Sequence, residues 1–151
     1  MAWIVLIAVA ALWLWWTSQG TAMSAGTGAG VTEQGGTLGT VQKMAQMIYQ
    51  FEGGGKPGAT NEWNNNPGNI GGGQATYQTQ QQGWNALYSY IQRHVQANPN
   101  WTFQNFFAYY LTGDPNNLQT TIQGDPVSYA DYVASGLGAS PTQTVSSVLG
   151  A

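Results

Sequence analysis

Cysteine is absent from this 151-residue chain, and charged residues are scarce. Without cysteine the chain has no disulfide framework, no thiolate metal site and no cysteine nucleophile. A single histidine, His94, has too few partners for a zinc site. Only 6% of the residues are charged, against about 25% in a typical soluble domain. Any chemistry must therefore come from carboxylates, hydroxyls and amides, and we expect no metal or other cofactor.

Lysine and arginine are even fewer than the acidic residues. Lys43, Lys56 and Arg93 are the only ones, and the net charge is -3. Nucleic-acid binding depends on clustered Lys and Arg that neutralise phosphates, so we expect no nucleic-acid partner. The carboxylates are few enough for each to need its own explanation. They are Glu33, Glu52, Glu62, Asp114, Asp125 and Asp131.

A long apolar run, MAWIVLIAVAALWLWW, occupies residues 1–16. As a helix it would be about 24 Å long, somewhat shorter than the roughly 30 Å hydrocarbon core of a bilayer. Tryptophans lie near both of its ends, where indoles meet lipid headgroups. A signal peptide would begin with basic residues, and none precedes Lys43. We therefore expect residues 1–18 to form a transmembrane anchor, with a signal peptide and a buried core helix as the alternatives.

The rest of the chain divides into a linker, a helical domain and a tail. Residues 19–37 are mostly Gly, Ser, Thr and Ala, a composition typical of flexible linkers. From residue 38 onward, apolar residues recur at helical spacing and predict a mostly α-helical domain over 38–140. The expected N-caps of its first three long helices are Thr40, Thr79 and Thr102. Two GDP sequences each predict a helix start, because aspartate is a good N-cap and proline suits the first turn. A small hairpin or an extended piece is expected within 71–79, and 141–151 is expected to be a polar tail.

Glu52 ends the first predicted helix of this domain, directly before the glycines at 53–55. The helix macrodipole disfavours a carboxylate at this end by about 0.3–1 kcal/mol. Departures from a local rule often mark functional residues. Glu52 is therefore a candidate general acid, although the position also suits an ordinary last-turn residue.

The sequence NNNPGNI, residues 64–70, is the second candidate feature. Pro67 and Gly68 predict a type II turn between Asn66 and Asn69. The asparagine amides offer uncharged donors and acceptors, which suit sugar hydroxyls and acetamido groups. Asparagine is also common in turns for purely local reasons, so a structural role stays open.

Five segments, taken together and in order, resemble a known family. They are FEG, NNPGNI, YQT followed by GWNALYSYI, WTFQNFFAYY, and GDP followed by YADYVASGLG, and they span roughly residues 40–140. The chain resembles the lysozyme-like lytic transglycosylases of bacteriophages, most of all the virion-associated enzymes of membrane-containing, tectivirus-like phages.

The resemblance implies an α+β lysozyme-like fold and an activity on bacterial peptidoglycan. The enzyme would cleave the bond between N-acetylmuramic acid and N-acetylglucosamine and form a 1,6-anhydro product without a metal. It would open the cell wall locally during genome delivery, from the virion internal membrane or the host envelope. Its expected partners are peptidoglycan, the lipid membrane and other virion membrane or capsid proteins.

The resemblance also assigns residues. Glu52 falls on the catalytic glutamate, and Asn69 on a side-chain amide that faces the cleft. Tyr129 or Tyr132 corresponds to the aromatic residue near the acid, and we favour Tyr132. Trp63 and Tyr77 are candidates on other grounds, because they are aromatic residues in loop sequence that could stack on a sugar face. The full set of substrate-binding candidates is Trp63, Asn66, Gly68, Asn69, Tyr77 and Tyr132.

Two other functions remain open at this stage. A muramidase hydrolase would need a second carboxylate, about 5–5.5 Å from the first if retaining and about 6.5–9.5 Å if inverting. Glu62 is the nearby candidate for that role, and a solvated loop residue is the alternative. A catalytically silent, sugar-binding or structural virion membrane protein is the other function, and the presence of Glu52 argues against it.

Overall fold

The computed structural model describes residues 39–71 and 75–151, so the anchor predicted at 1–18 and the linker at 19–37 lie outside the described residues. The described part of the chain is mostly helical and contains no strand, which confirms the predicted helical domain. The hairpin expected within 71–79 is not formed by residues 71 and 75–79. Within 39–71 and 75–151, no helix combines the length and the apolar character that crossing a membrane requires.

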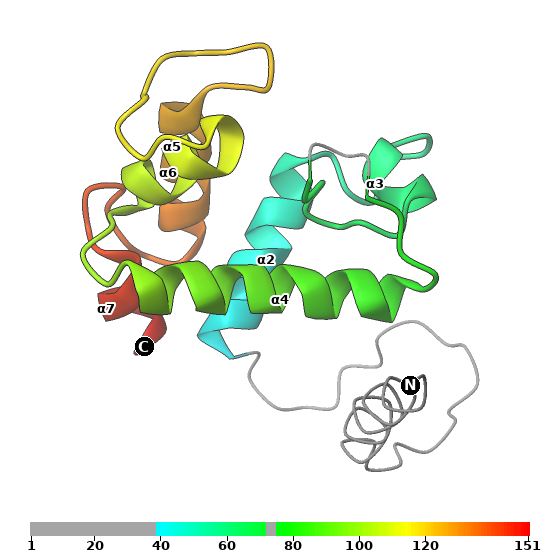
Figure 1. Ribbon diagram of the computed structural model, residues 1–151, viewed down its shortest axis with the longest axis horizontal. Helices are drawn as coiled ribbons and strands as arrows, with labels where there is room; N and C mark the ends of the chain where they lie inside the picture. Colours follow the sequence, from blue (N-terminus) through cyan, green and yellow to red (C-terminus); the bar gives the residue numbers. More distant parts are fainter. Residues whose placement is uncertain (1–38, 72–74) are drawn as a thin grey trace, which may run out of the picture. The chain divides into compact units, whose positions relative to one another are not determined.

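Two long helices cross at the base of the domain (Figure 1): α2 (Thr40–Phe51) and α4 (Gln80–Ala97). α4 begins where its sequence predicts, because the Thr79 hydroxyl accepts a hydrogen bond from the Gln82 amide at 3.2 Å. α2 begins one residue earlier than predicted. Gly39 is its N-cap, and Thr40 is already helical.

A second pair of helices, α5 (Phe103–Thr112) and α6 (Pro126–Gly136), packs side by side. Asp125 caps α6 as predicted and accepts from the Val127 amide at 3.0 Å. The helix predicted to start at Asp114 is absent, because this carboxylate instead closes a turn by accepting from the Asn116 amide at 3.0 Å. No apolar face follows Asp114 that a helix could bury.

Two short helices complete the described domain: α3 (Thr60–Trp63) and α7 (Val145–Leu149). α7 corrects the prediction of a polar tail over 141–151. Val145 is 1% exposed, and its amide donates to the Trp101 carbonyl at 3.0 Å. The few apolar residues of this segment thus join the core, which a count of its polar residues does not reveal.

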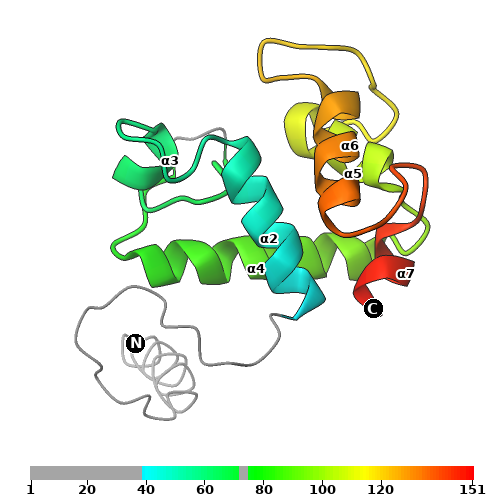
Figure 2. The same ribbon diagram turned by 180° about the vertical axis from the view of Figure 1, so that it is seen from behind.

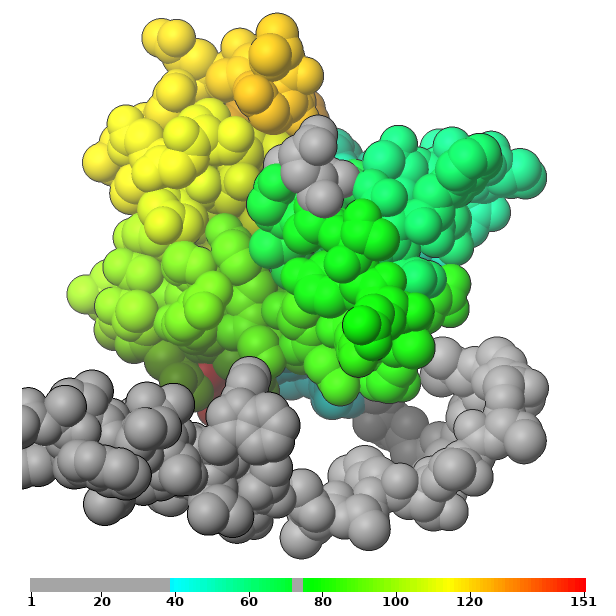
Figure 3. All heavy atoms as spheres, turned by 45° about the vertical axis from the view of Figure 1, so that its right-hand side comes forward, coloured from blue at the N-terminus to red at the C-terminus, as the bar shows by residue number. Residues whose placement is uncertain are grey.

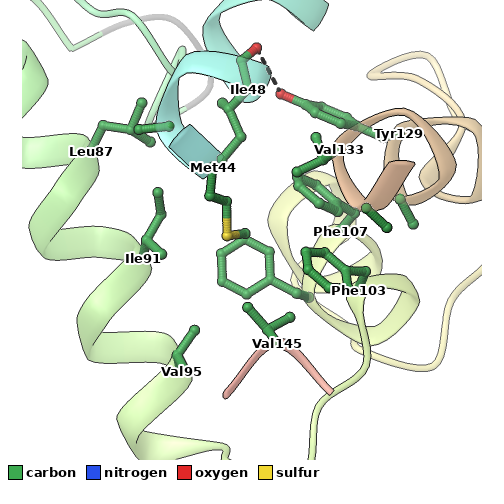
Figure 4. Close-up of a cluster of buried hydrophobic side chains, with 14 residues drawn as sticks. Met44, Ile48, Leu87, Ile91, Val95, Phe103, Phe107, Tyr129, Val133 and Val145 are labelled. Atoms are coloured by element: carbon green, nitrogen blue, oxygen red, sulfur yellow. Dashed lines mark hydrogen bonds between the residues drawn. The ribbon is translucent and has the colours of Figure 1, made fainter. Parts of the chain in front are cut away.

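The hydrophobic core lies where α2, α4, α5, α6 and α7 meet (Figure 4). Each helix contributes residues spaced three or four apart, as an amphipathic helix requires. Complete burial of one such side chain contributes about 1.5–3 kcal/mol to stability. The labelled members are Met44, Ile48, Leu87, Ile91, Val95, Phe103, Phe107, Tyr129, Val133 and Val145.

This packing leaves two flanks on either side of the upper end of α2. In both ribbon views α3 and its neighbouring loops lie on one side, the α5–α6 pair lies on the other, and α4 runs beneath (Figures 1 and 2). The end of α2, which carries Glu52, therefore points between the two flanks.

Candidate active site

A cavity of about 500 Å³ lies between the two flanks. α5 and the 113–125 segment form one wall, the chain from 52 to 71 forms the other, and α4 contributes Tyr90. Figure 3 shows both walls at the surface, the 113–125 segment in yellow to orange and the chain after α2 in blue-green. The described lining residues are Glu52, Thr60, Asn69, Ile70, Gly71, Tyr90, Tyr110, Leu111 and Gln123. Glu52 is the one carboxylate among them.

The backbone at Glu52 forms a Schellman motif that ends α2. The Gly53 amide donates to the Gln50 carbonyl at 3.1 Å, and the Gly54 amide donates to the Tyr49 carbonyl at 2.8 Å. This motif needs a left-handed residue after the C-cap, and Gly53 has φ +83°. The helix end therefore explains why glycine follows Glu52, and the motif places the Glu52 carboxylate at the very end of the helix.

Two neutral groups hold the Glu52 carboxylate, one on each oxygen. The Asn69 side-chain amide donates to Oε2 at 2.9 Å, and the Tyr129 hydroxyl donates to Oε1 at 2.8 Å. These bonds join three segments that are distant in sequence: the end of α2, the asparagine loop and α6. Glu52 is therefore oriented without a charged partner on either bond.

Tyr129 is fixed by its surroundings. Its ring is 1% exposed and stacks between Phe51, at a centroid distance of 4.0 Å, and Phe107, at 4.3 Å. Burial, together with the nearby Tyr110 and Glu52, raises the pKa of Tyr129 well above its ordinary value. The hydroxyl therefore keeps its proton at neutral pH and remains a donor to Glu52.

Tyr132, which the sequence favoured for this role, lies elsewhere. It is 43% exposed, and its hydroxyl donates to the Gln50 side chain at 3.3 Å. It does not line the cavity. The aromatic residue beside Glu52 is therefore Tyr129, the other of the two tyrosines that the resemblance offers.

The Pro67–Gly68 turn is present, closed by the Asn69 amide donating to the Asn66 carbonyl at 3.0 Å. It is not type II, because Gly68 lacks the positive φ of that turn. Glycine is needed here for space. A Cβ at this position would lie 2.7 Å from the Leu87 side chain.

The asparagines of this loop have different roles. Asn66 is fully buried, and its amide binds the backbone of Ile70 and Ala75, so its role is structural. Asn69 has φ +47°, a left-handed conformation that asparagine tolerates. This conformation at the last residue of the turn directs the Asn69 side chain to Glu52.

Tyr110 is a site residue that the sequence did not single out. It lines the cavity, donates to the Gly68 carbonyl and meets the Tyr129 ring edge-on at 5.7 Å. Burial and the charge of Glu52 raise its pKa well above the ordinary value. Tyr110 lies within the run FFAYY, which predicts a helix but not which of its rings faces a cavity.

The remaining candidates lie outside the cavity lining. Trp63 is 79% exposed. Tyr77 contributes its backbone, donating its amide to the Asn64 carbonyl and accepting from the Asn65 side chain. Glu62 lines a different cavity, of about 40 Å³, and accepts from the Tyr49 hydroxyl and the Gly55 amide. These bonds lower the pKa of Glu62.

Within residues 39–71 and 75–151, no group of histidine and acidic side chains could hold a metal ion. The site thus offers one carboxyl group, neutral hydroxyls and amides, and room for part of a sugar chain. Comparisons with protein-family models, with curated proteins and with solved structures found no match to this chain.

Proposed function

We propose that the chain is a membrane-anchored peptidoglycan lytic transglycosylase with a lysozyme-like domain, in which Glu52 acts as both acid and base. The observation that carries the proposal is the setting of Glu52. It is the one described carboxylate of the roughly 500 Å³ cavity, and uncharged donors from two other segments hold both of its oxygens.

The mechanism uses one carboxyl group twice. Protonated Glu52 donates its proton to the glycosidic oxygen as the bond from that oxygen to C1 of N-acetylmuramic acid breaks. The C6 hydroxyl of the same sugar then attacks C1 and gives its proton to the Glu52 carboxylate. The products are a 1,6-anhydro sugar and a free N-acetylglucosamine hydroxyl. No water is consumed, and Glu52 regains its starting proton.

The surroundings of Glu62 favour this reaction over hydrolysis. A hydrolase of either stereochemistry uses two carboxyl groups that flank one bond. Glu62 lines the small cavity, and its Oε1 is already engaged by Tyr49 and Gly55. An intramolecular hydroxyl nucleophile removes the need for that second group.

The cellular setting belongs to the same proposal. The apolar segment at 1–16 would anchor the domain in the virion internal membrane or the host envelope, and the Gly-rich linker would let it reach the wall. The enzyme would then open peptidoglycan locally during genome delivery, beside other virion membrane or capsid proteins.

The test is digestion of purified peptidoglycan by the full chain in mild detergent, with products identified by mass spectrometry. Wild type should release anhydro-muropeptides, and Glu52→Gln should release none. Asp131→Asn is the matched control, because it neutralises an exposed carboxylate of α6 that does not line the cavity. Reducing-end products would instead indicate a hydrolase. Binding of glycan strands without any cleavage would indicate the silent, sugar-binding protein.

A further inference from the structure

At its start, the loop that follows Glu52 is bonded to the end of α2 through the Gly53 and Gly54 amides. It is rich in glycine, and Gly53, Gly55 and Gly58 all have positive φ values, between +77° and +86°. Glycine supplies no side chain for packing and leaves the backbone more freedom than any other residue. Beyond Gly54, a contact from elsewhere in the fold is needed to fix the position of a loop of this composition.

Glu62 supplies such an anchor. Its Oε1 accepts a hydrogen bond from the Gly55 amide at 2.9 Å and another from the Tyr49 hydroxyl. Tyr49 belongs to α2, Gly55 to the loop and Glu62 to α3. One carboxylate oxygen thus joins all three segments.

α3 is in turn connected to the other side of the site. Thr60 lines the large cavity. The Asn61 carbonyl accepts from the Asn66 amide at 2.9 Å, and Asn66 begins the turn that ends at Asn69. Asn69 then donates to Glu52 at 2.9 Å. The position of α3 therefore affects Glu52 through the glycine loop and also through the asparagine turn.

We propose that Glu62 is a positioning residue that fixes the glycine loop and, through α3, the Asn69 amide that holds Glu52. It is not a second catalytic carboxylate. The inference rests on the proposed function of Glu52, and it assigns Glu62 a role within that site.

The protonation states of Glu62 and Tyr49 agree with this role. The hydrogen bonds from Tyr49 and Gly55 lower the pKa of Glu62, so it is ionised at neutral pH and accepts strongly. Burial and the neighbouring Glu62 raise the pKa of Tyr49 to about 12, so the hydroxyl keeps the proton that it donates.

Three variants separate positioning from catalysis: Glu62→Gln, Glu62→Ala and Tyr49→Phe. Glutamine keeps an Oε1 that accepts from both partners, so kcat of Glu62→Gln should stay within about threefold of wild type. Alanine removes the anchor, and kcat should fall about 10- to 100-fold, since a displacement of about 1 Å at a reacting group can cost 100-fold. Tyr49→Phe should be intermediate. A Glu62→Gln variant as inactive as Glu52→Gln would overturn the proposal, because only a proton-transferring or nucleophilic Glu62 requires the carboxylate itself.

A matched control separates positioning from general loss of stability. Val148→Ala removes half-buried apolar atoms from α7, a helix that contributes no described residue to the cavity lining. It should lower the thermal midpoint of unfolding and leave kcat unchanged at a temperature where the protein is folded. An equal loss of kcat in Val148→Ala and Glu62→Ala would contradict a specific role for Glu62.

Hydrogen exchange of the Gly55 amide, measured by NMR, tests the anchor without any activity. Exchange should be at least about tenfold faster in Glu62→Ala than in wild type and nearly unchanged in Glu62→Gln. If wild type proves inactive on peptidoglycan, the proposed function fails while this measurement still tests the anchor. Unchanged Gly55 exchange in Glu62→Ala would show that Glu62 does not hold the loop.

Discussion

Replacing Tyr129 with phenylalanine removes one oxygen from the site and leaves its packing in place. The ring would remain stacked between Phe51 and Phe107, at 4.0 and 4.3 Å, so the fold should persist. The main loss is the hydrogen bond to Glu52 Oε1, 2.8 Å long, and a longer bond to the Ile48 carbonyl, 3.5 Å, is lost with it. Hydrogen bonds to charged groups contribute about 1.5–3 kcal/mol. At about 1.36 kcal/mol for each factor of ten in rate, kcat/KM should fall about 10- to 150-fold.

The assay is the rate of anhydro-muropeptide release, measured for wild type, Tyr129→Phe and Tyr132→Phe. Tyr132 is the matched control, since it lies on the same helix, is 43% exposed and donates to Gln50 rather than Glu52. Tyr132→Phe should retain wild-type activity within about twofold. The reasoning is refuted if Tyr129→Phe is unaffected, or if Tyr132→Phe is the impaired variant.

Three further predictions concern stability, each measured by thermal or denaturant unfolding. Gly83→Ala should destabilise the protein by at least about 1–3 kcal/mol, because its Cβ would lie 1.8 Å from the Asn65 carbonyl oxygen. Helix propensity alone predicts that alanine stabilises, so a stabilised variant would contradict this close packing. Asn66→Ala should lower the free energy of unfolding by about 3 kcal/mol, since three buried hydrogen bonds are lost at about 1 kcal/mol each. A loss below about 1 kcal/mol would refute the structural role of Asn66. The pKa of Glu62 is lowered from 4.5 by folding, so its ionised form stabilises the protein above pH 4.5 and this contribution is lost as the pH falls further. Between pH 6 and 3, the thermal midpoint of Glu62→Gln should therefore fall less than that of wild type, and parallel curves would contradict the assignment.

The candidate acid could be found in the sequence because its signal is local. A carboxylate at a helix end, followed by glycine, depends on residues 51–54 alone, and the Schellman motif at Gly53 explains that pattern. Asn69 was identified through the family resemblance. Its contact with Glu52 depends on a left-handed residue that follows a turn, which composition does not specify.

The roles of Glu62, Tyr129 and Tyr132 could not be predicted from the sequence around each residue. Glu62 is ten positions from Glu52 in the sequence, yet it bonds to Tyr49 and Gly55 and lines a different cavity. Tyr129 and Tyr132 lie three residues apart on α6, a spacing that places both near the same helix face. The packing of α6 against α2 and α5 decides that Tyr129 is buried at Glu52 and that Tyr132 is not.

The sequence by itself determined the helices whose ends carry caps, since Thr79, Thr102 and Asp125 satisfy backbone groups within three residues of themselves. It also determined the polar, nearly charge-free character of the chain and the position of Glu52 at a helix end. Only the tertiary structure decided that Asn69 and Tyr129 hold Glu52 and that α7 joins the core. Capping and periodicity are set by neighbours in sequence. The bonds to Glu52 instead join residues 17 and 77 positions apart, and α7 packs against α2 from the opposite end of the domain sequence, so these contacts exist only once the helices have packed.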